Sequence, residues 1–429
     1  MICESPSARN SQSKVIFVNR YFFPDQSATS QLLSDLCFGL AKRGYAVHVI
    51  CSRQLYDEPK SNLEPRATVA GVTVHRVWTT RFGRSNLLGR AVDYATFYIS
   101  SGWMLLRLLS RGDTVVAKTD PPLISIVSMA AAKIKGAELV NWLQDIFPEV
   151  ATHLGANRLP GWLNGALRTL RDASLRAARV NVVLGDRMRQ FLLQGGIPAG
   201  KVVIIENWAV EHEGAPRPVS RSELRSRLGL AGRFVVGYSG NLGRAHEFQT
   251  LLDAASLMVE RREVSFLMIG AGVGMKMLEN AVTARGLANF QFLPYQPRDS
   301  LADSLAAADV HLVSLLPQLE GLIVPSKFYG ILAAARPVVF IGHPDGELAR
   351  VIGDAGIGAV VEVGDASALA RQLAGLNRDS PRREAMGAAA HRYYRDHYTA
   401  QRALDRWIEI LQPPSKEHAL TPGALARDV

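Results

Sequence analysis

The stretch VVGYSGNLGRAHEFQTLL, residues 235–252, decides the fold of this chain. Its apolar start is typical of a buried strand, its glycines of a tight turn, and its end of an amphipathic helix. Gly240 and Gly243 allow the backbone to turn sharply and to approach a ligand closely. A strand, turn and helix in this order place free N–H groups at the positive end of a helix dipole, where an anion can bind. Arg244 and His246 add hydrogen-bond donors, so we interpret the turn as a phosphate-binding loop.

The spacing of this loop differs from both common phosphate-binding motifs. The P-loop pattern G-x-x-x-x-G-K-[ST] is absent, and no G-x-G-x-x-G opens the helix. Taken alone, the glycines therefore also allow a plainer interpretation, in which they only shape the turn between a strand and a helix.

A second loop of the same kind lies in EGLIVPSKFYGILAAARPVVFIG, residues 320–342. The loop ends in Pro325, Ser326 and Lys327, a helix is expected next, and a strand follows from Pro337. Proline suits the first turn of a helix, and the residues after it lie where backbone N–H groups have no helical partner. We therefore predict a second anion site here.

The two loops together resemble the donor half of a glycosyltransferase of the GT-B fold, within the large retaining family 4. The branch they resemble builds exopolysaccharides and O-antigens and includes the colanic-acid transferases. The resemblance covers about residues 14–411. It implies an α/β chain of two Rossmann-like, doubly wound domains facing a central cleft. It also implies a nucleoside-diphosphate sugar as donor and a polyprenyl-diphosphate-linked saccharide as acceptor.

The first loop departs from the family pattern G-R-L-x-x-x-K-G, in which Arg and Lys hold the donor pyrophosphate. If the pattern starts at Gly240, Asn241 replaces the Arg and His246 replaces the Lys. Arg244, inside the same loop, is the candidate substitute. With Gly243, Ser326 and Lys327 these residues form the predicted donor-binding set.

The second loop departs from the family's E-x7-E motif, whose last Glu usually binds the ribose. Counting back seven residues from Pro337 gives Gly330 in place of that Glu, and Leu322 in place of the first. Glu320 lies two positions from Leu322. We therefore take Glu320 as the candidate for positioning a sugar hydroxyl, and the motif leaves the ribose without its usual carboxylate.

Asp145 is the second candidate catalytic residue. It follows a strand predicted at residues 138–143, and its segment is expected to face the cleft. Relatives often have His-Asp at this point, where the chain has Gln144 and Asp145. The resemblance implies that Asp145 orients the sugar or acceptor and stabilises positive charge at the anomeric carbon. The alternative is a helix-capping role before Pro148.

Three further positions are assigned by the same resemblance. Gly270 and Tyr295 are expected near the nucleoside, and the loop after the first strand, with Tyr21, Asp25 and Ser27, near the acceptor. Ser27 is also the predicted cap of the next helix. The run Gly270-Ala-Gly-Val-Gly274 raises the alternative of a dinucleotide site, but the third glycine of G-x-G-x-x-G would fall at Met275.

Apolar runs alternate with helical patterns along the chain, which predicts two doubly wound parallel sheets. The first-domain strands are expected at residues 15–18, 46–51, 72–77, 114–117, 138–143, 180–184 and 202–205. The second-domain strands are expected at 234–240, 264–270, 290–293, 310–315 and 338–341. The predicted order is a flexible N-terminus 1–13, an acceptor domain 14–210, a linker 211–219, a donor domain 220–399, a helix 400–411 crossing back, and a mobile tail 412–429.

Composition limits the possible partners. The 429 residues are 48% hydrophobic, and their net charge of +10 favours anionic partners. The apolar, aromatic segment 91–109 is bracketed by arginines, which is typical of a protein that binds an anionic membrane surface. A core helix with a solvated arginine face is the alternative. We expect a cytoplasmic protein bound peripherally to the inner membrane face, with neither a signal peptide nor a transmembrane span, and no nucleic-acid partner.

No metal or cofactor is expected. The chain contains no Asp-x-Asp, and its cysteines, Cys3, Cys37 and Cys51, lack metal-ligand spacing. Two other functions stay open: an NAD-dependent oxidoreductase that modifies sugar nucleotides, and a catalytically silent sensor or scaffold. The oxidoreductase would need a first-strand glycine fingerprint, and the chain lacks one.

Overall fold

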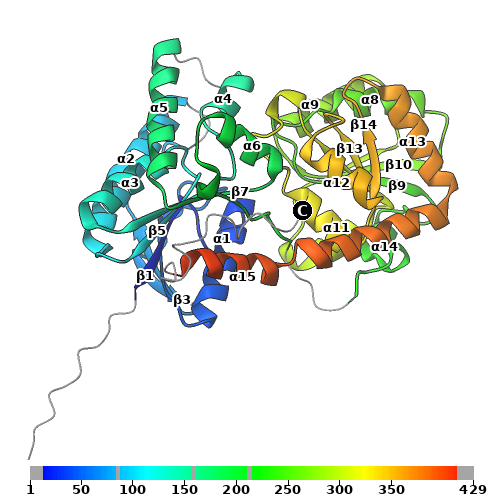
Figure 1. Ribbon diagram of the computed structural model, residues 1–429. Coiled ribbons are helices and arrows are strands. Elements are labelled where there is room, and N and C mark those ends of the chain that lie inside the picture. Colours follow the sequence, from blue (N-terminus) through cyan, green and yellow to red (C-terminus); the bar gives the residue numbers. More distant parts are fainter. Residues whose placement is uncertain (1–12, 84–86, 156–159, 210–214, 413–429) are drawn as a thin grey trace, which may run out of the picture.

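The computed structural model describes residues 13–83, 87–155, 160–209 and 215–412, which form two α/β domains side by side (Figure 1). Most of the segments predicted as a flexible N-terminus and a mobile tail lie outside these residues, as does the first part of the predicted linker.

The N-terminal domain contains an eight-stranded sheet in the order β3-β4-β2-β1-β5-β6-β7-β8. All neighbours are parallel except β3 and β4. The strands are β1 (Lys14–Val18), β2 (Ala46–Ser52), β3 (Arg66–Val69), β4 (Val72–Val77), β5 (Thr114–Lys118), β6 (Glu138–Trp142), β7 (Val180–Val183) and β8 (Val202–Ile204).

Helices cover both faces of this sheet. One face packs on α1 (Ala28–Lys42) and α15 (Ala400–Leu411), around the buried rings of Phe17, Trp142 and Trp407. The C-terminal helix thus lies on the N-terminal domain. The other face packs on α2 (Leu87–Leu108) and α3 (Ile124–Lys135). The remaining helices are α4 (Glu149–His153), α5 (Gly161–Ala177) and α6 (Asp186–Gln194).

The C-terminal domain contains a six-stranded parallel sheet in the order β11-β10-β9-β12-β13-β14. Its strands are β9 (Phe234–Asn241), β10 (Val264–Ala271), β11 (Phe290–Leu293), β12 (Val310–Ser314), β13 (Val338–Ile341) and β14 (Gly358–Val361). Its helices are α7 (Glu223–Arg227), α8 (Gln249–Leu257), α9 (Val273–Ala284), α10 (Leu301–Ala306), α11 (Lys327–Ala333), α12 (Glu347–Ala355), α13 (Ala366–Arg378) and α14 (Ser380–His397). Short 3-10 turns lie at Ala199–Lys201, Val219–Arg221, Arg298–Ser300 and Pro317–Leu319.

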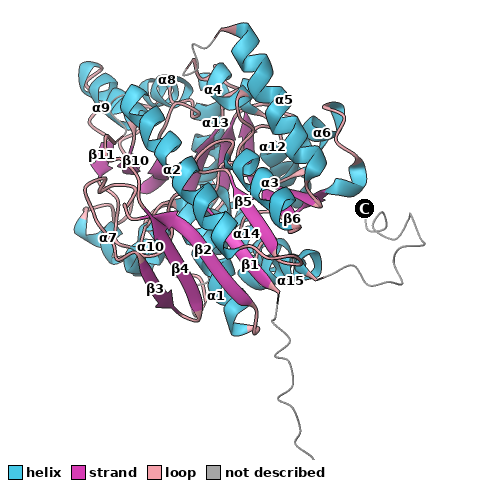
Figure 2. Ribbon diagram, turned by 90° about the vertical axis from the view of Figure 1, so that its left-hand side faces the viewer, coloured by secondary structure: helices cyan, strands magenta, loops and turns pink. Residues whose placement is uncertain are grey.

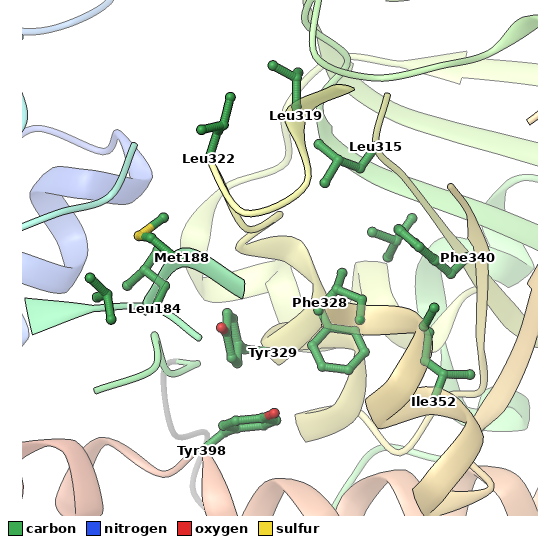
Figure 3. Packing of buried hydrophobic residues seen from close by; sticks show 14 of the residues in the cluster. Leu184, Met188, Leu315, Leu319, Leu322, Phe328, Tyr329, Phe340, Ile352 and Tyr398 are labelled. Atoms are coloured by element: carbon green, nitrogen blue, oxygen red, sulfur yellow. The ribbon is translucent and has the colours of Figure 1, made fainter. Parts of the chain in front are cut away.

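A hydrophobic core joins the two domains. Leu184 and Met188 from the first domain belong to the same buried cluster as Phe328 and Tyr329 from the second. Figure 3 shows Tyr329 with Leu184 and Met188 on one side and Phe328 on the other. The backbone is also paired across the boundary, because the N–H of Ile146 donates to the carbonyl of Leu322 over 2.9 Å. The loop that leads to Lys327 is thereby fixed against the end of β6.

Three details differ from the sequence-based expectations. Strands β3 and β14 were not predicted. The helix after the glycine-rich turn begins only at Gln249, so its N-terminus does not adjoin Gly243 as expected. Likewise, α11 begins at Lys327 with Ser326 as N-cap, and Pro325 precedes the helix instead of opening it.

Candidate functional site

The candidate site lies where the order of strands in the second sheet changes direction. The chain leaves β9 on one side to form β10 and returns on the other side as β12. Loops after such neighbouring strands diverge, and ligands of doubly wound sheets bind in the crevice between them. Here the loop after β9 carries residues 242–248 and the loop after β12 carries residues 315–326.

Glycines allow the strand ends to come together at this crevice. Gly240 and Gly270 are register partners on β9 and β10 with φ of 130° and 131°. A Cβ on Gly270 would lie 2.1 Å from the carbonyl oxygen of Gly240, so only glycine fits. The predicted residue Gly270 therefore shapes the loop after β9 from the neighbouring strand.

Lys327 is the centre of the site. Its ammonium lies 4.1 Å from the ring centroid of Tyr238 and donates to the hydroxyl of that residue. It also lies 3.2 Å from Nε2 of His246 and 3.4 Å from the carbonyl oxygen of Asn241. Tyr238 in turn donates to the same carbonyl over 2.9 Å. The second loop thus delivers a cation to the first.

The contacts of His246 determine its tautomer. Its Nδ1 lies 2.6 Å from the carbonyl oxygen of Ser314, which can only accept, so Nδ1 carries the proton. Nε2 is then free to accept from Lys327. Burial, and next the charge of Lys327, lower the pKa of His246 to about 3. His246 is therefore neutral at physiological pH, and the hydrogen bond that its Nε2 accepts positions the ammonium of Lys327.

The charge of Lys327 is uncompensated. Burial lowers its pKa well below the usual range. Among the described residues no carboxylate forms an ion pair with its ammonium. A buried cation without a counter-charge is costly, and an arriving anion would relieve that cost.

The other predicted donor-binding residues surround this point. Asn241 is exposed at the end of β9, and Ser326 is exposed beside Lys327. Arg244 is exposed as well, and within the described part of the chain its guanidinium makes no hydrogen bond or ion pair. Its position in the loop leaves it available to a ligand.

Glu320 contacts a helix N-terminus. Its carboxylate accepts from the backbone N–H of Glu347 over 3.2 Å, at the start of α12. It packs so closely on Gly346 that a Cβ there would lie 2.6 Å from its Oε1. Burial raises the pKa of Glu320. A role toward a sugar stays a prediction, and this contact is what the carboxylate makes in the structure.

Glu347 makes the equivalent contact across the domain boundary. Its carboxylate accepts from the backbone N–H of Arg187 over 2.7 Å, in the first turn of α6. A carboxylate at a helix N-terminus satisfies free N–H groups and suits the helix dipole. The helix that Glu347 caps belongs to the other domain.

Asp145 lies at the domain boundary, paired through its backbone with Ile323. Burial raises the pKa of its carboxyl to about 6, against the hydroxyl of Thr119, which lowers it. Its Oδ1 is buried and has no hydrogen-bond partner among the described residues. The alternative capping role is not supported, because the N-cap of α4 is Pro148.

The predicted acceptor loop is held by its own hydrogen bonds. Asp25 accepts from the N–H and hydroxyl of Ser27 and from the N–H of Tyr56. Ser27 is the N-cap residue of α1, as predicted, although its hydroxyl bonds Asp25 and not the helix. Tyr21 is buried, with its ring edge-on to Tyr56 at 5.6 Å. Tyr295 is 53% exposed, and burial, followed by the influence of Tyr56 and Asp57, raises its pKa to about 12.

Sequence reasoning missed Tyr238 and Ser314. Tyr238 appeared only as part of an apolar strand, although it lies two residues before the first glycine of the loop. Ser314 contributes its backbone carbonyl, which no side-chain pattern reveals. In the described part of the chain, no group of three or more His, Cys, Asp or Glu side chains could hold a metal ion, and no helix is long and apolar enough to cross a membrane.

Comparison with protein families gives two matches along the chain. Residues 29–208 match the glycosyl transferase 4-like domain, and residues 220–393 match the glycosyl transferases group 1 domain. The boundary between the two matches falls in the predicted linker. Neither match is to an oxidoreductase.

Two curated bacterial proteins are similar over most of their length. The probable glycosyltransferase WbjE of Pseudomonas aeruginosa is 27% identical over 339 residues, 78% of this chain and 83% of that protein. The putative colanic acid biosynthesis glycosyl transferase WcaI of Escherichia coli K12 is 25% identical over 406 residues, 92% of this chain and 97% of that protein.

Solved structures share the fold. HepE of Anabaena, in complex with UDP-glucose, superposes with a TM-score of 0.70 at 17% identity, over 93% of this chain and 99% of that one. WaaG, a glycosyltransferase involved in lipopolysaccharide biosynthesis, superposes with a TM-score of 0.68 at 18% identity over the same shares.

Proposed function

Since the chain belongs to the glycosyltransferases that join a glycosyl transferase 4-like domain to a group 1 domain, and has the GT-B fold, we propose its reaction in more detail. It transfers a sugar from a nucleoside-diphosphate sugar to a lipid-linked glycan in bacterial surface polysaccharide synthesis, with retention at the anomeric carbon and without a metal. The similarity to WbjE, a probable glycosyltransferase, supports the reaction class, and the name of WcaI, which refers to colanic acid biosynthesis, supports the pathway class.

The observation that carries this proposal is the uncompensated ammonium of Lys327. In the reaction the bond from the anomeric carbon to the β-phosphate oxygen breaks, and negative charge grows on that oxygen. A preorganised cation in a water-poor crevice stabilises such charge strongly. Lys327 is held for this task by Tyr238 and His246, and Arg244 is exposed at the same loop.

The negative charge on the departing phosphate oxygen also accounts for the proton of the acceptor. The acceptor hydroxyl forms the new bond to the anomeric carbon from the face that the phosphate leaves, and its proton passes to the departing phosphate oxygen. No protein base is needed for that step. Ionised Asp145, across the boundary from the Lys327 loop, would stabilise positive charge on the sugar ring.

A lipid-linked acceptor requires a surface that meets the membrane, and α2 supplies one. Leu88, Val92, Ile99 and Trp103 are exposed by 77%, 43%, 74% and 58%. Their spacing places them on one face of the helix. Figure 2 shows α2 running across the outside of the N-terminal domain. Arg107, exposed and stacked over Trp103 at 4.7 Å, adds the positive charge that anionic lipids attract.

Vesicle sedimentation tests this surface. We expect the protein to bind vesicles containing phosphatidylglycerol and to lose most of that binding in Ile99→Ser with Trp103→Ala. Leu257→Ser is the matched control, because Leu257 is 62% exposed on the other domain. Equal binding by all variants would contradict a role of α2 in membrane binding.

The reaction itself is tested with a donor panel. Thermal shift is measured against UDP, GDP, ADP and CMP sugars and NAD(H), with and without EDTA. We expect one nucleoside diphosphate sugar to stabilise the protein regardless of EDTA, and the UDP-glucose complex of HepE makes UDP sugars the first to try. NMR of the product then gives the anomeric configuration. Stabilisation by NAD(H) alone would contradict the proposal, and binding without turnover would favour the sensor or scaffold.

A further inference from the structure

The C-terminal domain has a cavity of about 620 Å³ at the edge of its sheet opposite the donor loops. Its lining includes Gly232, Asp309 and Pro337, which lie just before β9, β12 and β13. The donor loops follow the other ends of the same strands. A strand of five residues spans roughly 17 Å, so the two places are separate. The volume suits a small ligand.

Three guanidinium groups line this cavity, which we call the arginine cavity: those of Arg225, Arg336 and Arg383. Two carboxylates also line the cavity, that of the partly buried Asp309 and that of the exposed Glu384. The Oδ2 of Asp309 accepts from Arg225 over 2.9 Å and from the N–H of Val235 over 2.7 Å. Its Oδ1 lies 3.8 Å from Arg383. Asp309 therefore serves two of the cations, and the three guanidinium groups exceed the two carboxylates of the lining by one positive charge.

Arg336 is the cation without a carboxylate of its own. It is 7% exposed and donates to the carbonyls of Ala335 and Arg217 over 3.1 and 2.7 Å. Its Nε is buried and has no partner among the described residues. Burial lowers its pKa to about 10. A buried donor of this kind is normally paired, so the structure leaves the cation of Arg336, which lines the cavity, incompletely satisfied.

The mouth of the cavity carries hydroxyls. Ser220 is exposed at the rim. Ser380 lies on the other side, where its hydroxyl contacts the exposed Glu384 over 3.2 Å. Hydroxyls and arginine forks together suit phosphate oxygens.

We propose that the arginine cavity binds a small phosphorylated metabolite at a site distinct from the donor site. The guanidinium groups of Arg225, Arg336 and Arg383 supply hydrogen-bond donors and a net positive charge to the phosphate oxygens. The occupant would contact the chain segment that leads from one domain to the other, because Pro218, Val219 and Ser220 line the cavity. This inference does not rest on the transferase activity.

Calorimetric titration with inorganic pyrophosphate, at constant ionic strength, tests the site. Lys327→Gln protein is used, so that the donor loop does not take the probe. We expect saturable binding with one site per chain. On the same background, Ser220→Glu adds a negative charge at the mouth and Arg336→Gln removes the unpaired donor. Each should weaken binding by about tenfold or more.

Ser367→Glu is the matched control, because Ser367 is exposed in the first turn of α13, where an added carboxylate suits the helix. Its affinity should stay within about twofold of the background. Ser220→Glu decides the matter if Arg336→Gln unfolds, since Ser220 is exposed. Absence of saturable binding, or equal affinity in Ser220→Glu, would show that these arginines serve only the fold.

Discussion

Each domain places a lysine against an aromatic ring near the carboxyl edge of its sheet. Lys118 ends β5, with its ammonium 3.7 Å from the ring centroid of Trp142. Lys327 begins α11, 4.1 Å from the ring centroid of Tyr238. Burial lowers both pKa values well below the usual range. The two sites differ in what surrounds the charge.

Lys118 is enclosed by its own domain. It is 1% exposed, it donates to the carbonyl of Thr29 over 2.8 Å, and the carboxylates of Asp120 and Asp35 partly restore its pKa. Lys327 is only partly buried, and burial alone acts on its pKa. Lys118 thus has carboxylates nearby within its own domain, whereas Lys327 lacks an anion. The difference identifies Lys327 as a binding group and Lys118 as a structural one.

The largest effect is expected for Lys327→Gln. Glutamine keeps a donor but removes the charge that meets the leaving diphosphate, so kcat should fall by about 100- to 1,000-fold. The stability of the fold should not fall, because the substitution removes a desolvated charge. Steady-state kinetics measure the expected loss of kcat, and a denaturant melt measures the stability. A variant that keeps its activity, or one that is unfolded, would mean that Lys327 is a structural residue like Lys118.

Asp145→Asn comes next, with an expected loss of about 30-fold in kcat/KM, or 2 kcal/mol of barrier. The wild-type kcat/KM should fall below about pH 6, where the carboxyl takes up a proton, and the Asn variant should lack this limb. A profile that is flat for the wild type, or unchanged in the variant, would contradict an ionised role.

The same pKa makes a prediction about stability. The folded state raises the pKa of Asp145 to about 6, so its contribution is complete below about pH 4 and is lost as the pH rises through 6. Above that range Asp145→Asn should be more stable than the wild type by at most about 3 kcal/mol. Urea melts at pH 4 and pH 8 measure this difference, which should be absent at pH 4.

His246→Ala should have a smaller effect, about tenfold in kcat/KM, because it removes one hydrogen bond that positions Lys327. Since the pKa of His246 is about 3, it should add no limb to the pH profile between pH 5 and 8. A limb near pH 6.5 that vanishes in the variant would mean that His246 acts as an acid or base itself.

The smallest effect on catalysis is expected for Lys118→Met. The variant should lose about 1 to 3 kcal/mol of stability, because the carbonyl of Thr29 loses its partner. Its kcat per folded molecule should stay within about threefold of the wild type. Activity loss without a change in stability would remove the contrast between the two lysines.

The sequence predicted the parts of the fold that carry strong patterns. Apolar runs located the central strands, while β3, with alternating exposed residues, and β14, a short run opened by Gly358, were missed at the sheet edges. Lys327 was predicted from its loop. Its setting was not, because the bond from His246 to Ser314 joins residues 68 positions apart. Glu320 shows the same limit: its motif position gave no sign of the N-terminus of α12, which its carboxylate contacts.

The most direct test compares two ligands on two proteins. The nucleoside diphosphate found in the donor panel and its parent nucleoside are titrated into the wild type and Lys327→Gln. We expect the substitution to weaken binding of the diphosphate by about 100-fold and to leave binding of the nucleoside unchanged. Equal affinity of both proteins for the diphosphate, or an equal loss for both ligands, would contradict the claim that Lys327 is the receptor of the donor phosphates.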